Sequence, residues 1–320
     1  MSTHISNINE IQIRNTTSHK EVHDHTQTTR DENCSGQSRD QKVLNHHDDE
    51  GQANQATIIQ NIFSALTWNL GSNNNRITKA RFEYCMKTYY HLFAPLDYIV
   101  LQEVGFKNVQ DKLGPLKETH ICHSARIPTG KTCCAETFVV LEKKGLCKGT
   151  QMPLNEQSLQ RFEILQKYRC QYVELSNVIF LNVHLSRKGR DGVKGLEIRK
   201  RELRGIFKTI KNICKDKHVV IAGDFNTYYQ LVDEVDKIDF LYYDPDSNNT
   251  TTGKNCFDHF LYNKSLKLVG CAVIPVTDKI ICNNHYPKIA LFTTAKKVMK
   301  SYKENWTNLN SKLQRVSKPN

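Results

Sequence analysis

The sequence lacks a long uninterrupted apolar run. No stretch of its 320 residues approaches the ~20 apolar residues of a transmembrane helix. The opening segment Met1–Ile8 also lacks the apolar core of a secretory signal peptide. These absences predict a protein without a membrane span that works in the cytoplasm or nucleus. Its eleven cysteines, an odd number, then favour reduced thiols over a disulfide framework.

A recognisable zinc motif is missing as well. His120, Cys122 and His123 precede Cys133 and Cys134, but this spacing matches no standard set of zinc ligands. We therefore interpret the cysteines as small apolar side chains of the interior.

Apolar residues make up only 38% of the chain, and the deficit is concentrated near its start. Residues 1–57 show almost no apolar periodicity, so this segment cannot bury enough surface to offset the entropy of ordering. We expect a disordered polar tail over 1–57 and one folded domain over 58–295. The segment 296–320 carries seven basic residues and one acidic residue, and we expect a basic C-terminal tail or helix.

Acidic residues are outnumbered outside the polar tail. The tail holds 5 Lys and Arg against 9 Asp and Glu, whereas the rest of the chain carries a formal charge of +16. A domain this basic is expected to meet a polyanion such as nucleic acid, a phosphorylated lipid or an anionic membrane surface. A generally basic, solvated exterior is the alternative.

Short apolar segments alternate with helical patterns between residues 62 and 291. Apolar residues at helical spacing predict helices over 77–93 and 196–213. The predicted strands are 65–69, 96–101, 135–141, 171–175, 177–185, 219–222, 257–262, 268–276 and 288–292. Many strands with helices between them indicate an α/β fold in which helices cover sheets that face each other.

Polar side chains end several of these strands. Asn69, Glu103 and His184 each close one strand, and a Gly-Asp-Phe-Asn run containing Asp224 and Asn226 closes another. Buried strands normally carry apolar side chains throughout, so these residues require a functional reason. Positions i and i+2 of an extended strand project to the same side, so Asp224 and Asn226 can reach one phosphate or one metal ion together.

Two later segments complete the set, with Asp258 in Cys-Phe-Asp-His-Phe-Leu and His285 in Asn-Asn-His-Tyr-Pro. In this order the motifs resemble the endonuclease/exonuclease/phosphatase superfamily over residues 62–292. The resemblance implies a four-layer α/β/β/α sandwich of the deoxyribonuclease I type and the hydrolysis of phosphate esters.

The resemblance also implies roles for individual residues. His285 is implied to be the general base that activates water, with Asp258 fixing its tautomer. His184 is implied to contact the phosphate, and Glu136 is our candidate for its carboxylate partner. The predicted catalytic set is His285, Asp258, His184, Asp224, Asn226 and Glu136, and it leaves out the neighbouring His259.

A divalent metal ion, Mg²⁺ or Mn²⁺, is the expected cofactor. Glu103 offers the hard carboxylate oxygen that Mg²⁺ prefers, and Asn69 and Asn284 are the other predicted ligands. Asn284 departs from the resembled family, which usually has Asp before the catalytic histidine. Because Asn keeps an oxygen but loses the charge, we expect weaker metal binding and one dominant metal site.

The segment after His184 is rich in basic residues. Arg187, Lys188 and Arg190 lie in a predicted loop and are candidates for contacts with substrate phosphates, which give affinity without base specificity. The charges of the helix that follows are expected to face solvent.

These observations favour a divalent-metal-dependent phosphodiesterase, most simply an endonuclease that cleaves DNA or RNA as a monomer. One alternative is a phosphohydrolase of the same fold that acts on phosphoinositides or phosphotyrosyl-DNA. Another is a nucleic-acid binder without catalysis that has lost activity through Asn284.

Overall fold

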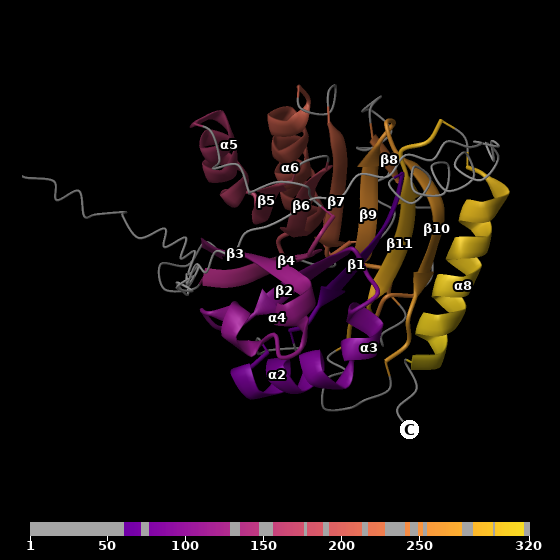
Figure 1. The fold of residues 1–320 in the computed structure, drawn as a ribbon. Helices are drawn as coiled ribbons and strands as arrows, with labels where there is room; N and C mark the ends of the chain where they lie inside the picture. Colours follow the sequence, from indigo (N-terminus) through magenta and orange to yellow (C-terminus); the bar gives the residue numbers. More distant parts are fainter. Residues whose placement is uncertain are drawn as a thin grey trace, which may run out of the picture. The chain divides into compact units, whose positions relative to one another are not determined.

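Two β-sheets face each other in the computed structural model (Figure 1), which describes residues 61–71, 77–128, 135–146, 156–175, 178–187, 192–212, 217–227, 241–243, 249–251, 255–276, 284–296 and 298–316. The tail predicted over 1–57 lies outside these residues, as do Cys133, Cys134, Lys188 and Arg190. Among the described helices, none is long and apolar enough to cross a bilayer.

The first sheet has the strand order β10-β11-β1-β2-β4-β3. Its strands are β10 (Lys267–Val273), β11 (Lys288–Thr293), β1 (Ile62–Asn69), β2 (Tyr98–Val104), β4 (Ala135–Lys143) and β3 (His120–Pro128). Strands β1 and β2 are parallel, and the other neighbours pair antiparallel.

The second sheet has the strand order β5-β6-β7-β9-β8. Its strands are β5 (Cys170–Glu174), β6 (Val178–His184), β7 (His218–Asp224), β9 (Asp258–Asn263) and β8 (Leu241–Tyr243). Strands β6 and β7 are parallel, and the other pairs are antiparallel. Along β5-β6-β7-β9-β8 the pairs are antiparallel, parallel, antiparallel and antiparallel, and β4-β2-β1-β11-β10 shows the same order. Each sheet therefore contains one parallel pair.

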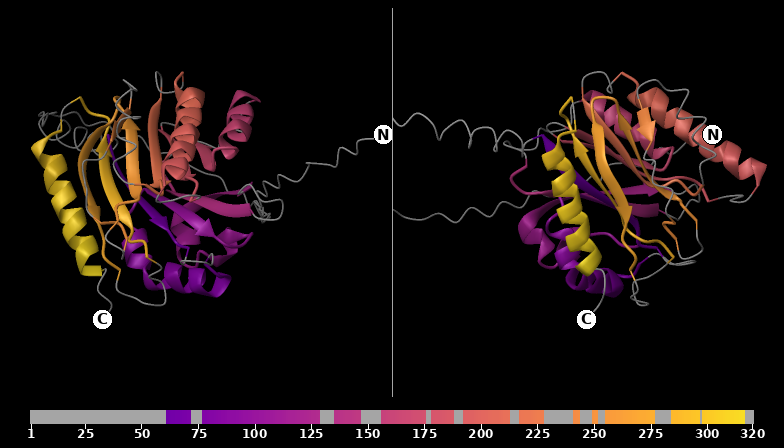
Figure 2. Two further views of the ribbon diagram at one scale, coloured as in Figure 1. Left: turned by 180° about the vertical axis from the view of Figure 1, so that it is seen from behind. Right: turned by 90° about the vertical axis from the view of Figure 1, so that its right-hand side faces the viewer.

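Helices cover the outer face of each sheet (Figure 2). On the first sheet lie α2 (Lys79–Thr88), α3 (Tyr90–Phe93), the 3-10 turn η1 (Val109–Lys112), α4 (Leu116–Thr119) and α8 (Lys300–Val316). On the second sheet lie α5 (Glu156–Gln166) and α6 (Val193–Ile210). The four layers confirm the predicted α/β/β/α architecture.

Successive side chains of each strand point to opposite faces of its sheet, and the apolar ones form three cores. On β1, Leu66 and Trp68 pack toward the helices of the first sheet, whereas Ala65 lies in the cluster between the sheets with Phe180 and Phe292. A third cluster joins the second sheet to α5 and α6. Because neighbouring strand residues point to opposite faces, each sheet is apolar on both sides, as a buried sheet requires.

Several elements differ from the sequence-based expectation. The helix predicted over 77–93 is divided into α2 and α3 at Tyr89, and β3 and α5 were not predicted. Strand β3 is an edge strand whose exposed and half-buried residues do not alternate regularly, which explains why its pattern was missed.

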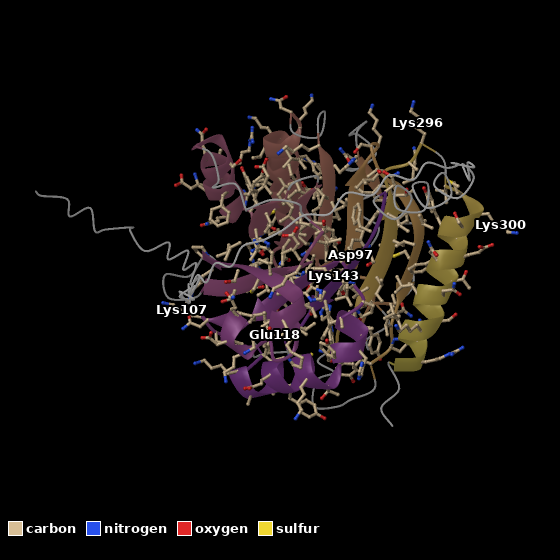
Figure 3. The ribbon with its side chains drawn as sticks, viewed as in Figure 1. Asp97, Lys107, Glu118, Lys143, Lys296 and Lys300 are labelled. Carbon is tan, nitrogen blue, oxygen red and sulfur yellow. The ribbon has the colours of Figure 1, made fainter. Side chains whose placement is uncertain are left out.

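Within the basic segment 296–320, α8 packs on β10. Tyr302 and Leu313 are buried, and Trp306 lies so close to Gly270 that a Cβ there would be 2.4 Å from its ring. Lys296, just before the helix, and Lys300, its first residue, project outward (Figure 3). The amphipathic spacing thus places an apolar stripe on the sheet and leaves the charge outside.

Candidate active site

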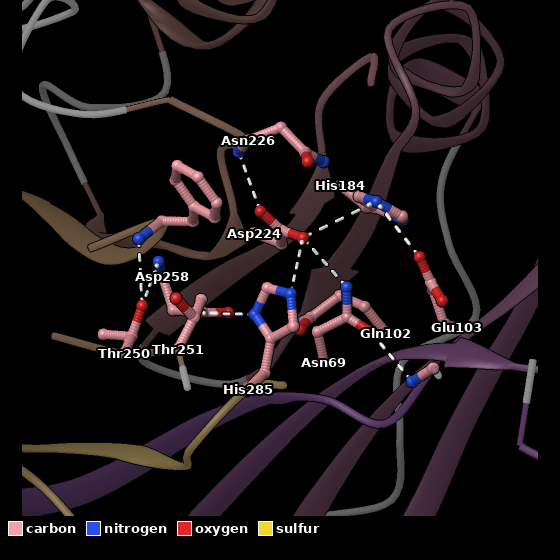
Figure 4. A network of polar contacts seen from close by, with 12 residues as sticks. Asn69, Gln102, Glu103, His184, Asp224, Asn226, Thr250, Thr251, Asp258 and His285 are labelled. Carbon is pink, nitrogen blue, oxygen red and sulfur yellow. Dashed lines mark hydrogen bonds and ion pairs between the residues drawn. The ribbon is translucent and has the colours of Figure 1, made fainter. Parts of the chain in front are cut away.

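Most of the predicted catalytic and metal-binding residues lie together where the two parallel strand pairs end (Figure 4): Asn69, Glu103, His184, Asp224, Asn226, Asp258 and His285. Strands β1 and β2 end at Asn69 and just beyond Glu103, and strands β6 and β7 end at His184 and Asp224. Parallel neighbours bring their carboxyl ends to the same edge of a sheet, and the facing sheets bring the two edges together. The fold therefore explains why these polar residues occupy strand ends.

A buried polar layer supports the site from below. Gln102 Nε2 donates to Asn182 Oδ1 at 2.8 Å and to Thr67 Oγ1 at 3.2 Å. Asn182 Nδ2 in turn donates to the carbonyls of Leu101 (2.9 Å) and Val139 (3.1 Å). These amides link the two sheets directly under the site, because Gln102 lies on β2 and Asn182 on β6.

Asp258 and His285 form the first histidine–carboxylate pair. His285 Nδ1 lies 2.8 Å from Asp258 Oδ2, so the proton on Nδ1 is donated to the carboxylate and Nε2 faces the site. Burial alone would lower the pKa of His285, but the carboxylates of Asp258 and Asp224 raise it to about 9. The pair therefore stabilises the imidazolium that His285 becomes when it accepts a proton.

Glu136 and His184 form the second pair, as predicted from the sequence. His184 Nδ1 lies 2.7 Å from Glu136 Oε1. Burial alone would raise the pKa of Glu136, but His184, Arg169 and the backbone N–H of Glu103 lower it to about 2. Burial likewise opposes the imidazolium of His184, yet Glu136 raises its pKa.

Asp224 lies between the two pairs. Its Oδ2 accepts a hydrogen bond from Asn69 Nδ2 at 2.9 Å and is 3.7 Å from Nε2 of both His184 and His285. Burial would raise the pKa of Asp224, but the two histidines and its hydrogen-bond donors lower it. Asp224 is therefore an anion that both imidazole rings face.

Asn226 contributes to the backbone geometry of the site. Its N–H donates to Asp224 Oδ1 at 2.7 Å and its Nδ2 donates to the Leu185 carbonyl at 3.0 Å. The sequence predicted that Asn226 and Asp224 would reach one phosphate together. In the structure the donors of Asn226 hold the ends of β6 and β7 in place.

Glu103 lies opposite His184, at the end of β2. Its Oε1 is 3.5 Å from His184 Nε2, and burial raises its pKa. Glu103 has a positive φ of 58°, and the adjacent Gly71 leaves room for its carboxylate, since a Cβ on Gly71 would lie 1.4 Å from Oε2. Glycine at position 71 is thus required for Glu103 to occupy this position.

The donor set at Glu103 fits a hard divalent cation. In the part of the chain that the structure describes, no group of three or more His, Cys, Asp or Glu side chains is arranged as a closed metal cage. One carboxylate, that of Glu103, with the amide of Asn69 nearby, suits Mg²⁺, which keeps several waters and takes further oxygens from substrate phosphates. Burial raises the pKa of Glu103 because it destabilises the charged carboxylate, and a bound cation would stabilise that charge.

Asn284 precedes His285 and has a φ of 91°. Asn tolerates positive φ better than most residues, so this side chain suits the turn into the His285 segment. Its role as a metal ligand stays a prediction.

The basic segment after His184 is described only in part. Arg187 is exposed directly after the buried Ser186, and its contact with a substrate phosphate stays a prediction. The expectation that all charges of the next helix face solvent was wrong for Arg199, which is 1% exposed and donates from Nη1 to the Ser186 carbonyl at 3.2 Å. Glu202 Oε2 accepts the Ser186 N–H at 2.8 Å, so α6 fixes the chain beyond the site.

His120 and His123, whose spacing with the cysteines matches no zinc motif, form hydrogen bonds and ion pairs with other residues. His120 bonds to Thr119 Oγ1 and the Leu96 carbonyl, and His123 Nε2 lies 3.2 Å from Glu142 Oε2. Each of these contacts joins β3 to its surroundings.

Two residues that contact the site were not predicted. Arg169 donates from Nη2 to Glu136 Oε2 at 2.8 Å, and Thr250 Oγ1 accepts the backbone N–H groups of Phe257 (2.9 Å) and Asp258 (3.1 Å). Both come from segments outside the strand-end motifs, and no local sequence signal distinguishes them. Only the tertiary fold brings them to the site.

Comparison with known proteins is consistent with this geometry. The sequence matches the endonuclease/exonuclease/phosphatase family over residues 66–287, and the chain therefore belongs to that family. Members of this family are generally metal-dependent phosphoesterases. No curated protein matches the sequence.

Solved structures share the fold at low sequence identity. TDP2 from Caenorhabditis elegans is 15% identical with a TM-score of 0.51, over 76% of this chain and 80% of that one. Truncated TDP2 from the same organism is 14% identical with a TM-score of 0.50, over 72% and 97%. The human Nocturnin catalytic domain with bound sulfate is 13% identical with a TM-score of 0.47, over 72% and 94%. The family and the deoxyribonuclease I-like fold predicted from the sequence are thus confirmed.

Proposed function

We propose that this protein is a divalent-metal-dependent phosphodiesterase that cleaves DNA or RNA endonucleolytically, in the cytoplasm or nucleus. The observation that carries the proposal is the convergence of two histidine–carboxylate pairs on one aspartate, with each Nε2 atom 3.7 Å from Asp224 Oδ2. Nucleic-acid binding by itself requires no such buried arrangement.

The two pairs divide the chemistry of phosphodiester hydrolysis. His285 Nε2 takes a proton from the attacking water, while Asp258 holds the Nδ1 proton and stabilises the resulting imidazolium. His184, held by Glu136, donates from Nε2 to a phosphoryl oxygen as negative charge develops on it. This Nε2 is buried and has no hydrogen-bond partner among the described residues, so a donor is available for that oxygen.

A metal ion bound through Glu103, with Asn69 and Asn284 as the other proposed ligands, would neutralise charge on the phosphoryl group. Glu103 supplies the charge of that site. Asn69 also donates to Asp224 and accepts the Gly71 N–H at 2.9 Å, so hydrogen bonds fix both ends of its amide.

The charge distribution supports a nucleic-acid substrate. Outside residues 1–57 the chain carries +16, and Arg187 is exposed beside the end of β6. Phosphate contacts from such a surface favour a polyanion over a small neutral ester. A phosphohydrolase acting on phosphoinositides or phosphotyrosyl-DNA is the second candidate, because the same catalytic groups would serve it.

Plasmid nicking by the purified full chain tests the proposal. We expect nicking with Mg²⁺ or Mn²⁺, none with EDTA, and unchanged or higher activity in Asn284→Asp. An inactive wild type that Asn284→Asp rescues would instead identify a binder without catalysis. In that case, DNA retention in EDTA should weaken steeply with salt. Inactivity of both proteins on DNA and RNA, with turnover of a phosphoinositide or phosphotyrosyl-DNA, would favour the second candidate.

A further inference from the structure

Arg169 lies at the junction between α5 and β5, one residue before the first strand position. Its N–H donates to the Gln166 carbonyl at 3.0 Å, which closes the turn after the helix. Its carbonyl accepts the N–H of His184 at 3.1 Å, which continues the pairing of β5 with β6. The backbone of Arg169 is therefore bonded directly to a predicted catalytic residue.

The side chain of Arg169 reaches the carboxylate behind that residue. Nη2 lies 2.8 Å from Glu136 Oε2 and 3.1 Å from His184 Nδ1. The other carboxylate oxygen, Oε1, accepts from His184 Nδ1 at 2.7 Å and from the N–H of Glu103 at 2.9 Å. Glu136 thus receives three donors, and Arg169 is the one that occupies Oε2.

Burial makes this ion pair necessary. The Glu136 side chain is 2% exposed and the Arg169 side chain is 17% exposed. A buried carboxylate requires a compensating charge, and a guanidinium in fixed contact also restricts the rotation of the carboxylate plane. Rotation of that plane would move the acceptor of the His184 Nδ1 proton.

The backbone conformation of Arg169 also indicates a functional role. Arg169 has a φ of 55°, a left-handed conformation that a long side chain rarely adopts. Of the five non-glycine residues with positive φ in the described ranges, four lie in or against the site: Glu103, Arg169, Asn226 and Asn284. Unfavourable conformations of this kind persist where surrounding contacts impose them, and they cluster at functional sites.

We propose that Arg169 is a positioning residue: its guanidinium fixes the Glu136 carboxylate, and Glu136 in turn fixes the His184 ring. The inference rests on the proposed phosphodiesterase function for its kinetic consequence. Its structural part, the control of His184 by Arg169, does not depend on turnover. Arg169 acts through Glu136 and is not assigned a contact with substrate.

Three variants of the full chain separate the possible roles. Arg169→Ala removes the guanidinium, Arg169→Lys keeps a charge without the planar donor, and Arg169→Gly removes the guanidinium while relieving the positive φ. We expect kcat to fall about 10–100-fold in the Ala and Gly variants with little change in KM, and less in the Lys variant. Arg169→Gly should melt at a higher temperature than Arg169→Ala, because glycine accepts this backbone conformation.

Added guanidinium ion should partly restore kcat in Arg169→Ala. Arg315→Ala, an exposed arginine on α8, should match the wild type in kcat and melting temperature. A rise in KM with unchanged kcat would overturn the proposal, because it would mean that Arg169 binds the substrate phosphate directly.

A spectroscopic measurement tests the positioning without turnover. In [15N]histidine-labelled protein, the Nδ1–H signal of His184 is identified by its loss in His184→Gln. We expect this signal to shift or broaden in Arg169→Ala and to be retained in Arg315→Ala. An unchanged signal in Arg169→Ala would refute the proposal. Absence of phosphodiesterase activity in the wild type would instead count against the proposed function, and the signal would still decide the role of Arg169.

Discussion

The two histidine–carboxylate pairs of the site have almost the same internal geometry. The Nδ1–oxygen distance is 2.8 Å for His285 and Asp258 and 2.7 Å for His184 and Glu136. Both Nε2 atoms face Asp224 Oδ2 at 3.7 Å. On these distances alone, either histidine could serve as the base.

Their surroundings differ in charge. Glu136 is ion-paired with Arg169, so part of its charge is already compensated, and the nearby guanidinium opposes a second positive charge on His184. His184 itself faces three carboxylates, those of Glu136, Glu103 and Asp224, and its pKa is also raised. His285 faces Asp258 and Asp224, and its pKa is raised to about 9. A histidine–carboxylate pair therefore acquires its properties from the residues around it, and the carboxylates around His285 stabilise the imidazolium that forms when it accepts a proton.

Removing the His285 imidazole should have the largest effect. We expect His285→Ala to reduce turnover about 10³-fold or more, since it removes the proposed general base. The fold should survive, because Trp68 Nε1 donates to the backbone carbonyl of His285 at 3.0 Å and not to its side chain. Nicking rates with Mg²⁺ and a thermal melt measure both quantities. A loss of less than tenfold would assign the base elsewhere.

Neutralising the two carboxylates tests the difference between the pairs. We expect Asp258→Asn to reduce kcat about 10²–10³-fold, because an amide disfavours the tautomer that His285 needs. Glu136→Gln should cost about 10–100-fold, because His184 stabilises charge and transfers no proton from water. Single-turnover cleavage by each variant gives the comparison. The reverse order would exchange the roles of the two histidines.

Much of this comparison could be anticipated from local sequence. The strand-end residues Asn69, Glu103, His184 and Asp224 were visible because a polar side chain at the end of an apolar run is unusual. The pairing of Glu136 with His184 was also expected, since each followed from family motifs. Such residues carry their signal within a few neighbouring positions.

The groups that distinguish the pairs could not be anticipated. Arg169 precedes an ordinary strand, and Thr250 lies in a polar segment without periodicity. Their importance depends on contacts with residues 33 and 8 positions away, respectively. The same limit applies to β3, an edge strand with irregular burial, and to Arg199, whose basic neighbours suggested a solvated helix face.

Thr250 tests whether the His285 pair also has a structural support. Its Oγ1 accepts two backbone N–H groups, and Thr250→Val would leave both donors buried without this acceptor. We expect the free energy of unfolding to fall by about 1–3 kcal/mol and kcat to fall severalfold. Thr209→Val is the matched control, since Thr209 Oγ1 donates only to the Gly205 carbonyl within α6, at 2.8 Å. Equal losses in both variants would show that Thr250 has no special role at Asp258.

His259 provides the smallest and most local test of the comparison, because it follows Asp258 directly but bonds to a carbonyl. Its Nε2 lies 3.1 Å from the Cys256 carbonyl, and burial, with Lys288 nearby, lowers its pKa to about 3. Below the unfolded pKa of about 6.5, the unfolded chain therefore binds a proton that the folded chain does not. The free energy of unfolding should fall with decreasing pH, by about 1.4 kcal/mol per pH unit from this group.

Urea denaturation at pH 6.5, 6.0 and 5.5 measures this dependence. His259→Gln should remove the contribution, so its slope should be smaller than that of the wild type by up to that amount. His91→Gln, at an exposed position on α3, should keep the wild-type slope. His184 and His285, whose pKa values are raised, contribute with the opposite sign, and because both histidines are present in the wild type and in His259→Gln, their contribution cancels when the two slopes are compared. An unchanged slope in His259→Gln would show that burial beside Asp258 does not suffice to keep a histidine neutral, and the difference between this residue and His285 would then need another cause.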